Sequence, residues 1–228
     1  MENKLSNKKP WNVKNYQTLT LIILLVGIII FNIAFFSMRY NILFGALNQP
    51  LLDWMISQRS PLLTDFMISI TTTLNPLNFL VLAGIITGVW AVYKRELWRP
   101  SLLVISIGIT VVFSTIIKLL TANGRPPQFD MIAPLEQGYS FPSWHTIGMG
   151  VFLLVLGYLI YSRKPTKARI ITWLLIAAIG TIIMASSRLY LGYHWLTDII
   201  ASVGLGLMIV AAIICIDRQA IKRFNKLK

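Results

Sequence analysis

The feature that most restricts the fold of this chain is a series of long apolar segments. An α-helix needs roughly 20 apolar residues to cross a bilayer, and several segments approach or exceed that length. Hydrophobic residues make up 56% of the 228-residue chain and charged residues only 13%, whereas soluble domains are about 25% charged. The sequence therefore predicts an all-α, polytopic membrane protein with six transmembrane helices in a bundle. We expect the spans near residues 18–37, 77–93, 99–119, 145–162, 168–186 and 195–216.

The segment between the first two spans is harder to assign. Residues 49–60 mix apolar and polar side chains and carry, at position 50, a proline suited to a first helical turn, which favours an interfacial position. Residues 62–74 are too short to cross a bilayer and end at Asn75-Pro76. This piece is either a short re-entrant helix or the first half of a helix that Pro76 breaks. We expect a short interfacial or re-entrant segment after the first span.

The distribution of basic residues predicts the orientation. The net charge is +13, and most lysines and arginines gather between apolar runs, as in cytoplasmic loops. Six spans with the N-terminus inside place 16 of the 21 basic residues in the cytoplasm, whereas a seventh span would turn the last three clusters outward. The 16 are Lys4, Lys8, Lys9, Lys14, Lys94, Arg95, Arg99, Arg163, Lys164, Lys167, Arg169, Arg218, Lys222, Arg223, Lys226 and Lys228. We therefore expect a multi-pass protein of the cytoplasmic (plasma) membrane with both termini in the cytoplasm. These clusters are expected to attract anionic lipids at the cytoplasmic face rather than nucleic acid.

The chain shows no internal repeat or low-complexity linker, which indicates one domain. We expect a cytoplasmic tail over 1–17, a transmembrane domain over 18–216 and a basic cytoplasmic tail over 217–228. The first apolar run is too long for a signal-peptide core and is interpreted as a retained helix. The single cysteine, Cys215, excludes an intrachain disulfide and is expected to serve packing.

Polar side chains from five separate stretches meet on the predicted outer face. Lys118 ends the third span, Arg125 follows it, and Arg188 follows the fifth, while the two histidines, His145 and His194, open the fourth and sixth spans. Ionisable residues at membrane depth suggest a functional site. Three cations with one nearby carboxylate, Asp198, would repel a metal ion but suit a multiply charged anion such as phosphate.

The same residues could carry out phosphoryl transfer. His194 and Asp198 are four positions apart, so on a helix they would share a face, and the carboxylate would fix the tautomer of the imidazole. The other ring nitrogen is then free to act as a nucleophile, while His145 can protonate a leaving oxygen. Ser143 precedes a predicted helix, where its hydroxyl either contacts phosphate or caps the helix.

Three short stretches resemble the signature of a known family. They are "KLLTANGRP" (118–126), "PSWH" (142–145) and "SRLYLGYHWLTD" (187–198), and together they resemble the three-part motif of the type 2 phosphatidic acid phosphatase (PAP2) superfamily. The resemblance extends from about residue 60 to 216.

The resemblance implies a membrane lipid phosphatase that works without a metal or other cofactor and passes through a phosphohistidine. It assigns His194 as nucleophile, Asp198 as its orienting partner and His145 as general acid. The residues that it implies for holding the phosphate are Lys118, Arg125, Ser143 and Arg188. Small bacterial members act on phosphatidylglycerophosphate, phosphatidate or undecaprenyl pyrophosphate, so a membrane lipid phosphate is the expected partner; nothing in the sequence fixes the oligomeric state.

One position departs from the family pattern. Trp144 stands where the family has glycine, which concerns the range of substrates more than the chemistry, because tryptophan can begin a helix with a negative φ. Two other functions use the same residues. A lipid-phosphate transporter or binding protein would use the cations without hydrolysis, although transporters place charge near the bilayer midplane. A phosphotransferase would pass the phosphate from the histidine to another lipid.

Overall fold

The computed structural model describes residues 13–162 and 166–226. Lys4, Lys8, Lys9, Arg163, Lys164 and Lys228 lie outside the described residues. In the described part the regular elements are helical, and no strand occurs there. The elements are α1 (Val13–Tyr40), α2 (Asn48–Ser57), α3 (Pro61–Thr73), α4 (Pro76–Lys94), α5 (Trp98–Thr121), the 3-10 helix η1 (Gln128–Asp130), α6 (Trp144–Tyr161), α7 (Lys167–Tyr190) and α8 (Leu196–Lys226).

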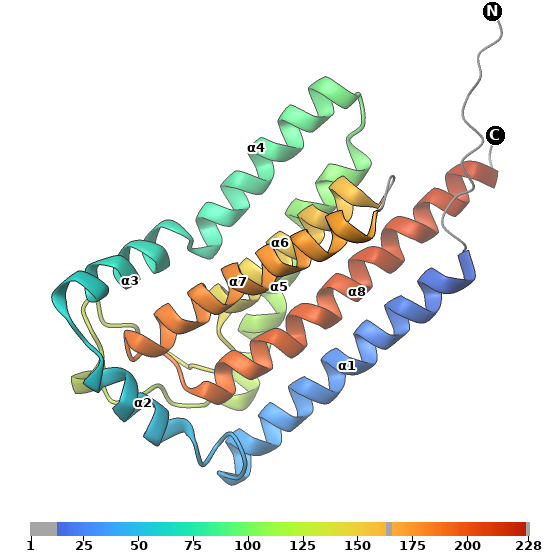
Figure 1. Ribbon diagram of the computed structural model, residues 1–228. Helices are drawn as coiled ribbons and strands as arrows, with labels where there is room; N and C mark the ends of the chain where they lie inside the picture. The colour runs from blue at the N-terminus through green and yellow to red at the C-terminus, as the bar shows by residue number, and fades with distance from the viewer. Residues whose placement is uncertain (1–12, 163–165, 227–228) are drawn as a thin grey trace, which may run out of the picture.

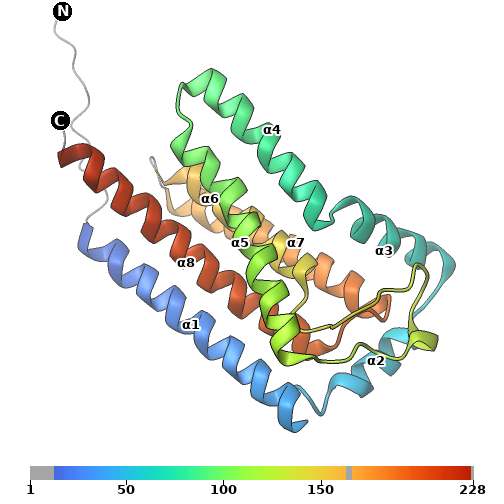
Figure 2. The same cartoon turned by 180° about the vertical axis from the view of Figure 1, so that it is seen from behind.

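α1 and α4 to α8 run along a common bundle (Figures 1 and 2). α1 and α4 to α8 are the described helices that are long and apolar enough to cross a membrane, which confirms the predicted all-α fold with six spans. α1 begins and α8 ends at one end of the bundle, whereas α2 and the α5–α6 loop lie at the opposite end (Figure 1). We call the latter the loop end and the former the terminal end.

The helices α6 and α8 form the centre of the bundle. More than half of the membrane-spanning window of each is buried, against 11% for α1. α1 nevertheless lies close along α8, because Gly27 and Gly204 face each other: a Cβ on Gly27 would stand 2.7 Å from the Gly204 carbonyl oxygen. Small residues that allow such close approach are typical of transmembrane helix pairs. The peripheral helices thus present apolar side chains to lipid while α6 and α8 hold the core.

The uncertain segment after the first span forms two helices. α2 is short and lies across the loop end, while α3 and α4 follow one another in a similar direction with a bend between them (Figures 1 and 2). The bend falls at Asn75, whose side-chain oxygen accepts a hydrogen bond from the Asn78 amide at 2.9 Å and caps α4, and Pro76 occupies the first turn of α4. The chain therefore follows the broken-helix alternative rather than returning as a re-entrant loop.

Several helices extend beyond the apolar runs that predicted them. α7 continues to Tyr190 rather than ending near residue 186, and α8 continues to Lys226 rather than residue 216. The length of an apolar run indicates the part of a helix that lies in the hydrocarbon core. The helix itself can continue into polar turns beyond that core, because its backbone hydrogen bonds do not depend on the bilayer. The basic stretch after residue 216 is therefore, through Lys226, a continuation of α8.

A buried ion pair joins the helices at the terminal end. Arg99, which the charge pattern groups with a cytoplasmic loop, lies in the first turn of α5. Its Nε is 3.3 Å from Asp217 Oδ2, and both side chains are almost fully buried. The Tyr158 hydroxyl donates to the same carboxylate at 2.6 Å, so α5, α6 and α8 meet at one carboxylate.

Candidate active site

The three sequence motifs come together at the loop end of the bundle. The end of α5 and the loop after it carry Lys118 and Arg125, the start of α6 carries His145, the last turn of α7 carries Arg188, and the turn before α8 carries His194. Of these, His145, Arg188 and His194 are at most 6% exposed. Residues spread over some 80 positions of sequence thus form one buried cluster.

His194 is held between an acceptor and a donor. Its Nδ1 is 3.1 Å from Asp198 Oδ2, and its Nε2 is 3.4 Å from Arg125 Nη1. A carboxylate can only accept and a guanidinium can only donate. Nδ1 therefore carries the proton, and Nε2 presents its lone pair toward Arg125. This is the tautomer that a nucleophilic Nε2 requires.

The His194–Asp198 pair does not lie on a helix, as the four-residue spacing had suggested. α8 begins at Leu196, so His194 lies two residues before it. Asp198 Oδ2 also accepts the Trp195 amide at 2.9 Å, which places the carboxylate at the start of the helix. Negative charge is favoured there by the exposed amides and the helix dipole. Asp198 therefore both caps α8 and orients His194.

A glycine shapes the turn that presents His194. Gly192 has φ of +76°, a conformation that side chains disfavour. A Cβ at this position would lie 2.5 Å from the Asp130 carbonyl oxygen. Arg59 holds the backbone around this turn, since its Nη2 donates to the Asp130 and Tyr190 carbonyl oxygens at 2.7 and 2.9 Å. Arg59, for which the sequence predicts no role, joins the α2–α3 turn to the end of α7.

The electrostatic surroundings keep His194 neutral. Burial lowers the pKa of His194 well below its ordinary value, and the positive charges of Arg188, Arg125 and Lys118 lower it further, with a smaller contribution from His145. A buried imidazole near three cations is disfavoured as a cation. His194 therefore keeps its Nε2 lone pair at physiological pH.

A second carboxylate, missed by the sequence analysis, lies among the arginines. Glu136 Oε2 is 2.9 Å from Arg125 Nη1, and its Oε1 accepts from Arg188 Nη2. The expectation of a single nearby carboxylate, Asp198, was therefore wrong. Glu136 presents two oxygens to two guanidinium groups, as a phosphate would.

Arg188 is held on several sides. Its Nη1 donates to Thr71 Oγ1 at 2.6 Å, and its guanidinium stands 4.5 Å from the centre of the Tyr193 ring. The residue is 1% exposed, and its Nε is buried without a hydrogen-bond partner among the described residues. An arginine with a free buried donor is suited to receive an additional acceptor.

A pocket of about 530 Å³ opens beside this cluster. Lys118, Arg125, Glu136 and Trp144 line it. Lys118 Nζ donates to the Tyr139 and Ser140 carbonyl oxygens at 2.8 Å each, which holds the ammonium at the pocket wall. Arg125 lines the pocket and also contacts His194 Nε2, so its side chain lies between the pocket and the imidazole.

The start of α6 supplies the remaining residues of the second motif. The Ser143 amide donates to Ser202 Oγ at 2.9 Å, and the Ser143 hydroxyl accepts from Thr146 Oγ1 at 3.2 Å instead of capping α6. His145 is 6% exposed, and its Nδ1 has no hydrogen-bond partner in the described part of the chain. The Trp144 ring meets the His145 ring edge-on at 5.6 Å and borders the pocket, so the indole stays at the site.

The titratable side chains do not form a metal-binding cluster. Within residues 13–162 and 166–226, no group of three His, Cys, Asp or Glu side chains is placed to hold a metal ion. Arginine and lysine surround the histidines instead, and their donors match phosphate oxygens. The arrangement can bind a phosphate group and present a neutral imidazole nitrogen to it.

Fold and site together define an integral membrane protein with a cationic, histidine-containing site at one end of a helical bundle. Residues 72–222 match the family model of the PAP2 superfamily, and the chain belongs to that superfamily. It is a membrane phosphatase of this superfamily, in which catalysis proceeds through a phosphohistidine.

Two curated relatives and one solved structure resemble the chain. It is 28% identical over 172 residues to phosphatidylglycerophosphatase B of Bacillus subtilis, covering 74% of this chain and 81% of that protein. It is 30% identical over 126 residues to the undecaprenyl-diphosphatase of Sulfolobus acidocaldarius, covering 53% of this chain and 56% of that protein. A crystal structure of a transmembrane PAP2-type phosphatidylglycerolphosphate phosphatase from Bacillus subtilis superposes with a TM-score of 0.74 over 88% of this chain and 96% of the other, at 22% identity. The last match concerns the fold.

Proposed function

We propose that this membrane phosphatase hydrolyses the terminal phosphate of a membrane lipid, with His194 as the nucleophile. The observation that carries the proposal is the imidazole of His194, held between Asp198 and Arg125 with its Nε2 unprotonated. The names of the relatives favour phosphatidylglycerophosphate or undecaprenyl pyrophosphate as substrate, and phosphatidate is a third lipid of the same kind.

The first step transfers the phosphoryl group to the enzyme. His194 Nε2 attacks phosphorus, a P–N bond forms, and the P–O bond to the lipid breaks. Asp198 accepts a hydrogen bond from Nδ1–H throughout and stabilises the positive charge that develops on the ring. Lys118, Arg125 and Arg188 neutralise the equatorial oxygens, which is the main requirement for phosphoryl transfer. Ser143 lies at the start of α6, where backbone amides favour an anion.

The second step returns the enzyme to its starting state. A bound dianionic phosphate offsets the positive charge of the surrounding arginines and lysine, which allows His145 to hold a proton and to give it to the departing lipid oxygen in the first step. In the second step a water attacks the phosphohistidine, His145 takes one of its protons, and the P–N bond breaks to release inorganic phosphate. The unpartnered Nδ1 of His145 leaves that ring free to exchange a proton.

Substrate binding requires Glu136 to move. Its carboxylate contacts Arg125 and Arg188, the two arginines proposed to hold the phosphate. A dianionic phosphate and a carboxylate cannot share these donors without strong repulsion. The lipid phosphate therefore replaces Glu136 on the arginines and brings phosphorus to Nε2 of His194.

The site is proposed to face outward from the cytoplasmic membrane, with both termini in the cytoplasm. The uneven distribution of lysine and arginine supports this orientation, and the site lies at the loop end, opposite the start of α1 and the end of α8 (Figure 1). The basic terminal end would then meet the anionic lipids of the inner leaflet. A cysteine introduced in loop 127–138, in a Cys215→Ala background, should react with an impermeant thiol reagent in intact cells. Labelling only after lysis would show that the loop, and with it the site, faces the cytoplasm.

The deciding experiment traps the covalent intermediate. Purified enzyme is mixed with lipid carrying labelled terminal phosphate, quenched within milliseconds, and separated under alkaline conditions. We expect base-stable, acid-labile label on the wild type and none on His194→Ala, whereas His145→Ala should still acquire label. Label on the His194→Ala protein would assign the nucleophile to another residue. The same assay with phosphatidylglycerophosphate, phosphatidate and undecaprenyl pyrophosphate ranks the substrates.

A further inference from the structure

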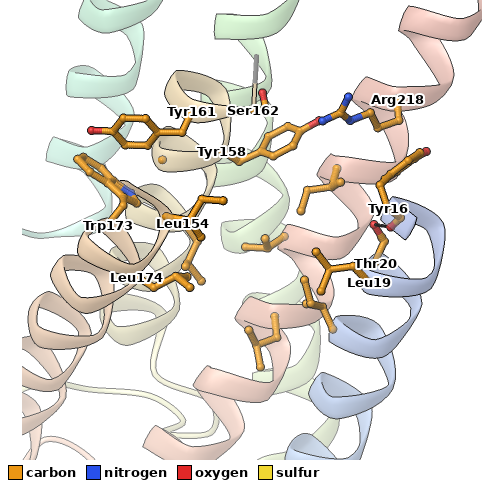
Figure 3. A pocket seen from close by; sticks show the side chains of 16 residues that line it. Tyr16, Leu19, Thr20, Leu154, Tyr158, Tyr161, Ser162, Trp173, Leu174 and Arg218 are labelled. Carbon is orange, nitrogen blue, oxygen red and sulfur yellow. Dashed lines mark hydrogen bonds between the residues drawn. The ribbon is translucent and has the colours of Figure 1, made fainter. Parts of the chain in front are cut away.

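A second cavity lies far from the catalytic residues, near the terminal end of the bundle. It measures about 400 Å³ and lies between α1, α6, α7 and α8. Leu19, Leu154, Trp173 and Leu174 are among the side chains around it (Figure 3). These helices are candidate membrane spans, so the apolar groove would open within the hydrocarbon of a bilayer, where an acyl chain is the available occupant.

One wall of the groove is formed by the Trp173 indole, which packs closely against Gly157. A Cβ on Gly157 would fall 1.9 Å from the Trp173 ring, and the Trp173 Nε1 donates to the Leu153 carbonyl oxygen at 2.6 Å. The Tyr161 ring packs edge-on against the same indole at 5.8 Å. The wall is therefore held in a fixed position by a hydrogen bond and two close contacts.

A cation stands at the upper end of the groove. Arg218 lies among its lining residues (Figure 3), with its guanidinium 5.2 Å from the Tyr16 ring centre and 5.7 Å from that of Tyr158. Its Nε is buried and has no hydrogen-bond partner among the described residues. The neighbouring carboxylate, Asp217, is already paired with Arg99, so this group of charges keeps an excess of one positive charge.

The position of Arg218 along α8 matches the level of lipid head groups. It lies 22 residues after Leu196, the first residue of α8, which is roughly 33 Å along a helix that rises 1.5 Å per residue. The hydrocarbon core of a bilayer is about 30 Å thick. Because the catalytic site is at the Leu196 end, Arg218 stands at the head-group level of the opposite leaflet. Tyr16, Tyr161 and Trp173 form the kind of aromatic belt found at that level.

We propose that this groove is a binding site for one anionic glycerophospholipid of the leaflet opposite the active site. One acyl chain lies along Leu154 and Leu174, and the lipid phosphate accepts hydrogen bonds from Arg218. The Arg218 Nε, which has no hydrogen-bond partner among the described residues, is a donor suited to a phosphate diester, and the apolar part of the groove below it suits the acyl chain. This lipid is a bound partner of the bundle, distinct from the substrate, and it joins α1 to α6 and α7.

Native mass spectrometry of the purified full chain tests the proposal. Phosphatidylglycerol and phosphatidylcholine with identical acyl chains are titrated separately, so that the head-group charge is the variable. We expect one phosphatidylglycerol to remain bound at least tenfold more tightly than phosphatidylcholine. Arg218→Gln should lower the ratio of the two affinities about tenfold, which is the effect of losing one charge-assisted hydrogen bond. Arg223→Gln, an exposed arginine on the same helix, should leave it unchanged.

A matched pair of groove variants tests the acyl-chain part of the site. Leu174→Trp fills the groove and should reduce retention of both lipids, whereas Leu175→Trp changes the adjacent lipid-facing residue, which is 57% exposed, and should have no effect. Formation of the phosphoenzyme by each variant shows that it is folded. Equal lipid retention by wild type and Arg218→Gln, or equal loss in Leu174→Trp and Leu175→Trp, would overturn the site.

Discussion

Replacing Glu136 with glutamine should tighten the binding of phosphate and of phosphate analogues. In the structure the carboxylate of Glu136 contacts Arg125 at 2.9 Å and also Arg188. Any phosphate that enters must first break both contacts. Glutamine keeps the size and one acceptor oxygen but removes the charge that competes with phosphate for the two guanidinium groups.

The size of the effect follows from the number and exposure of these contacts. A hydrogen bond to a charged group contributes about 1.5–3 kcal/mol. Glutamine can still accept from one arginine, so one such contact is lost. Because the Glu136 side chain is 24% exposed, solvent screening favours the lower value. About 1.5 kcal/mol corresponds to roughly tenfold in an inhibition constant.

The assay is inhibition by orthovanadate and inorganic phosphate at fixed lipid concentration in detergent micelles. Glu136→Gln should lower both inhibition constants about tenfold, and KM should decrease in the same direction. Asp130→Asn removes a charge from the same loop without touching the two arginines and should change the constants by less than twofold. Unchanged constants for Glu136→Gln, or an equal gain for Asp130→Asn, would refute the competition between carboxylate and phosphate.

Three further predictions concern the chemistry and a fourth concerns stability. His145→Ala should lower kcat by about 10²–10⁴ with lipid substrates, the usual effect of losing a general acid, but much less with p-nitrophenyl phosphate; equal losses would remove His145 from that role. Asp198→Asn should keep the fold and lower kcat by up to about 10⁴, as for the analogous change in a serine protease triad; a loss below tenfold in steady-state kinetics would contradict its orienting role. Activity should survive EDTA, and a loss that Mg²⁺ restores would show that a metal takes part. Because the pKa of His194 is lowered, the unfolded chain binds a proton below about pH 6.5 that the native chain does not. The Tm in detergent should therefore decrease from pH 7 to pH 5, and less steeply for His194→Gln; parallel curves would contradict this.

The helices could be predicted from sequence because each has a single dominant cause. A run of apolar residues long enough to cross a bilayer forms a helix, since every backbone group must be hydrogen-bonded there. The ends of the helices have several causes and were predicted less well. α8 continues ten residues beyond the expected end at 216, because polar residues at the membrane surface neither require nor forbid a helix.

The candidate site was predictable in composition but not in detail. Lys118, Arg125 and the histidines could be recognised because basic groups on the predicted outer side contradict the charge bias and therefore suggest a function. Glu136 gave no such signal, since it lies in an irregular loop and only the path of that loop brings it to Arg125 and Arg188. Spacing alone also suggested that His194 lies on a helix, whereas the positive φ of Gly192 turns the chain before α8 begins.

Residues that precede the region matched by the family model help to hold the catalytic site in place. The family match begins at residue 72. Yet Asn48 accepts the Thr197 amide at 3.1 Å in the first turn of α8, Arg59 holds two carbonyls behind the catalytic turn, and Thr71 supports Arg188. A fragment trimmed to the matched region would keep every residue of the three motifs and lose the contacts that hold them in place. A minimal catalytic fragment must accordingly begin ahead of α2, because the residues that fix the position of the catalytic side chains include Asn48, Arg59 and Thr71.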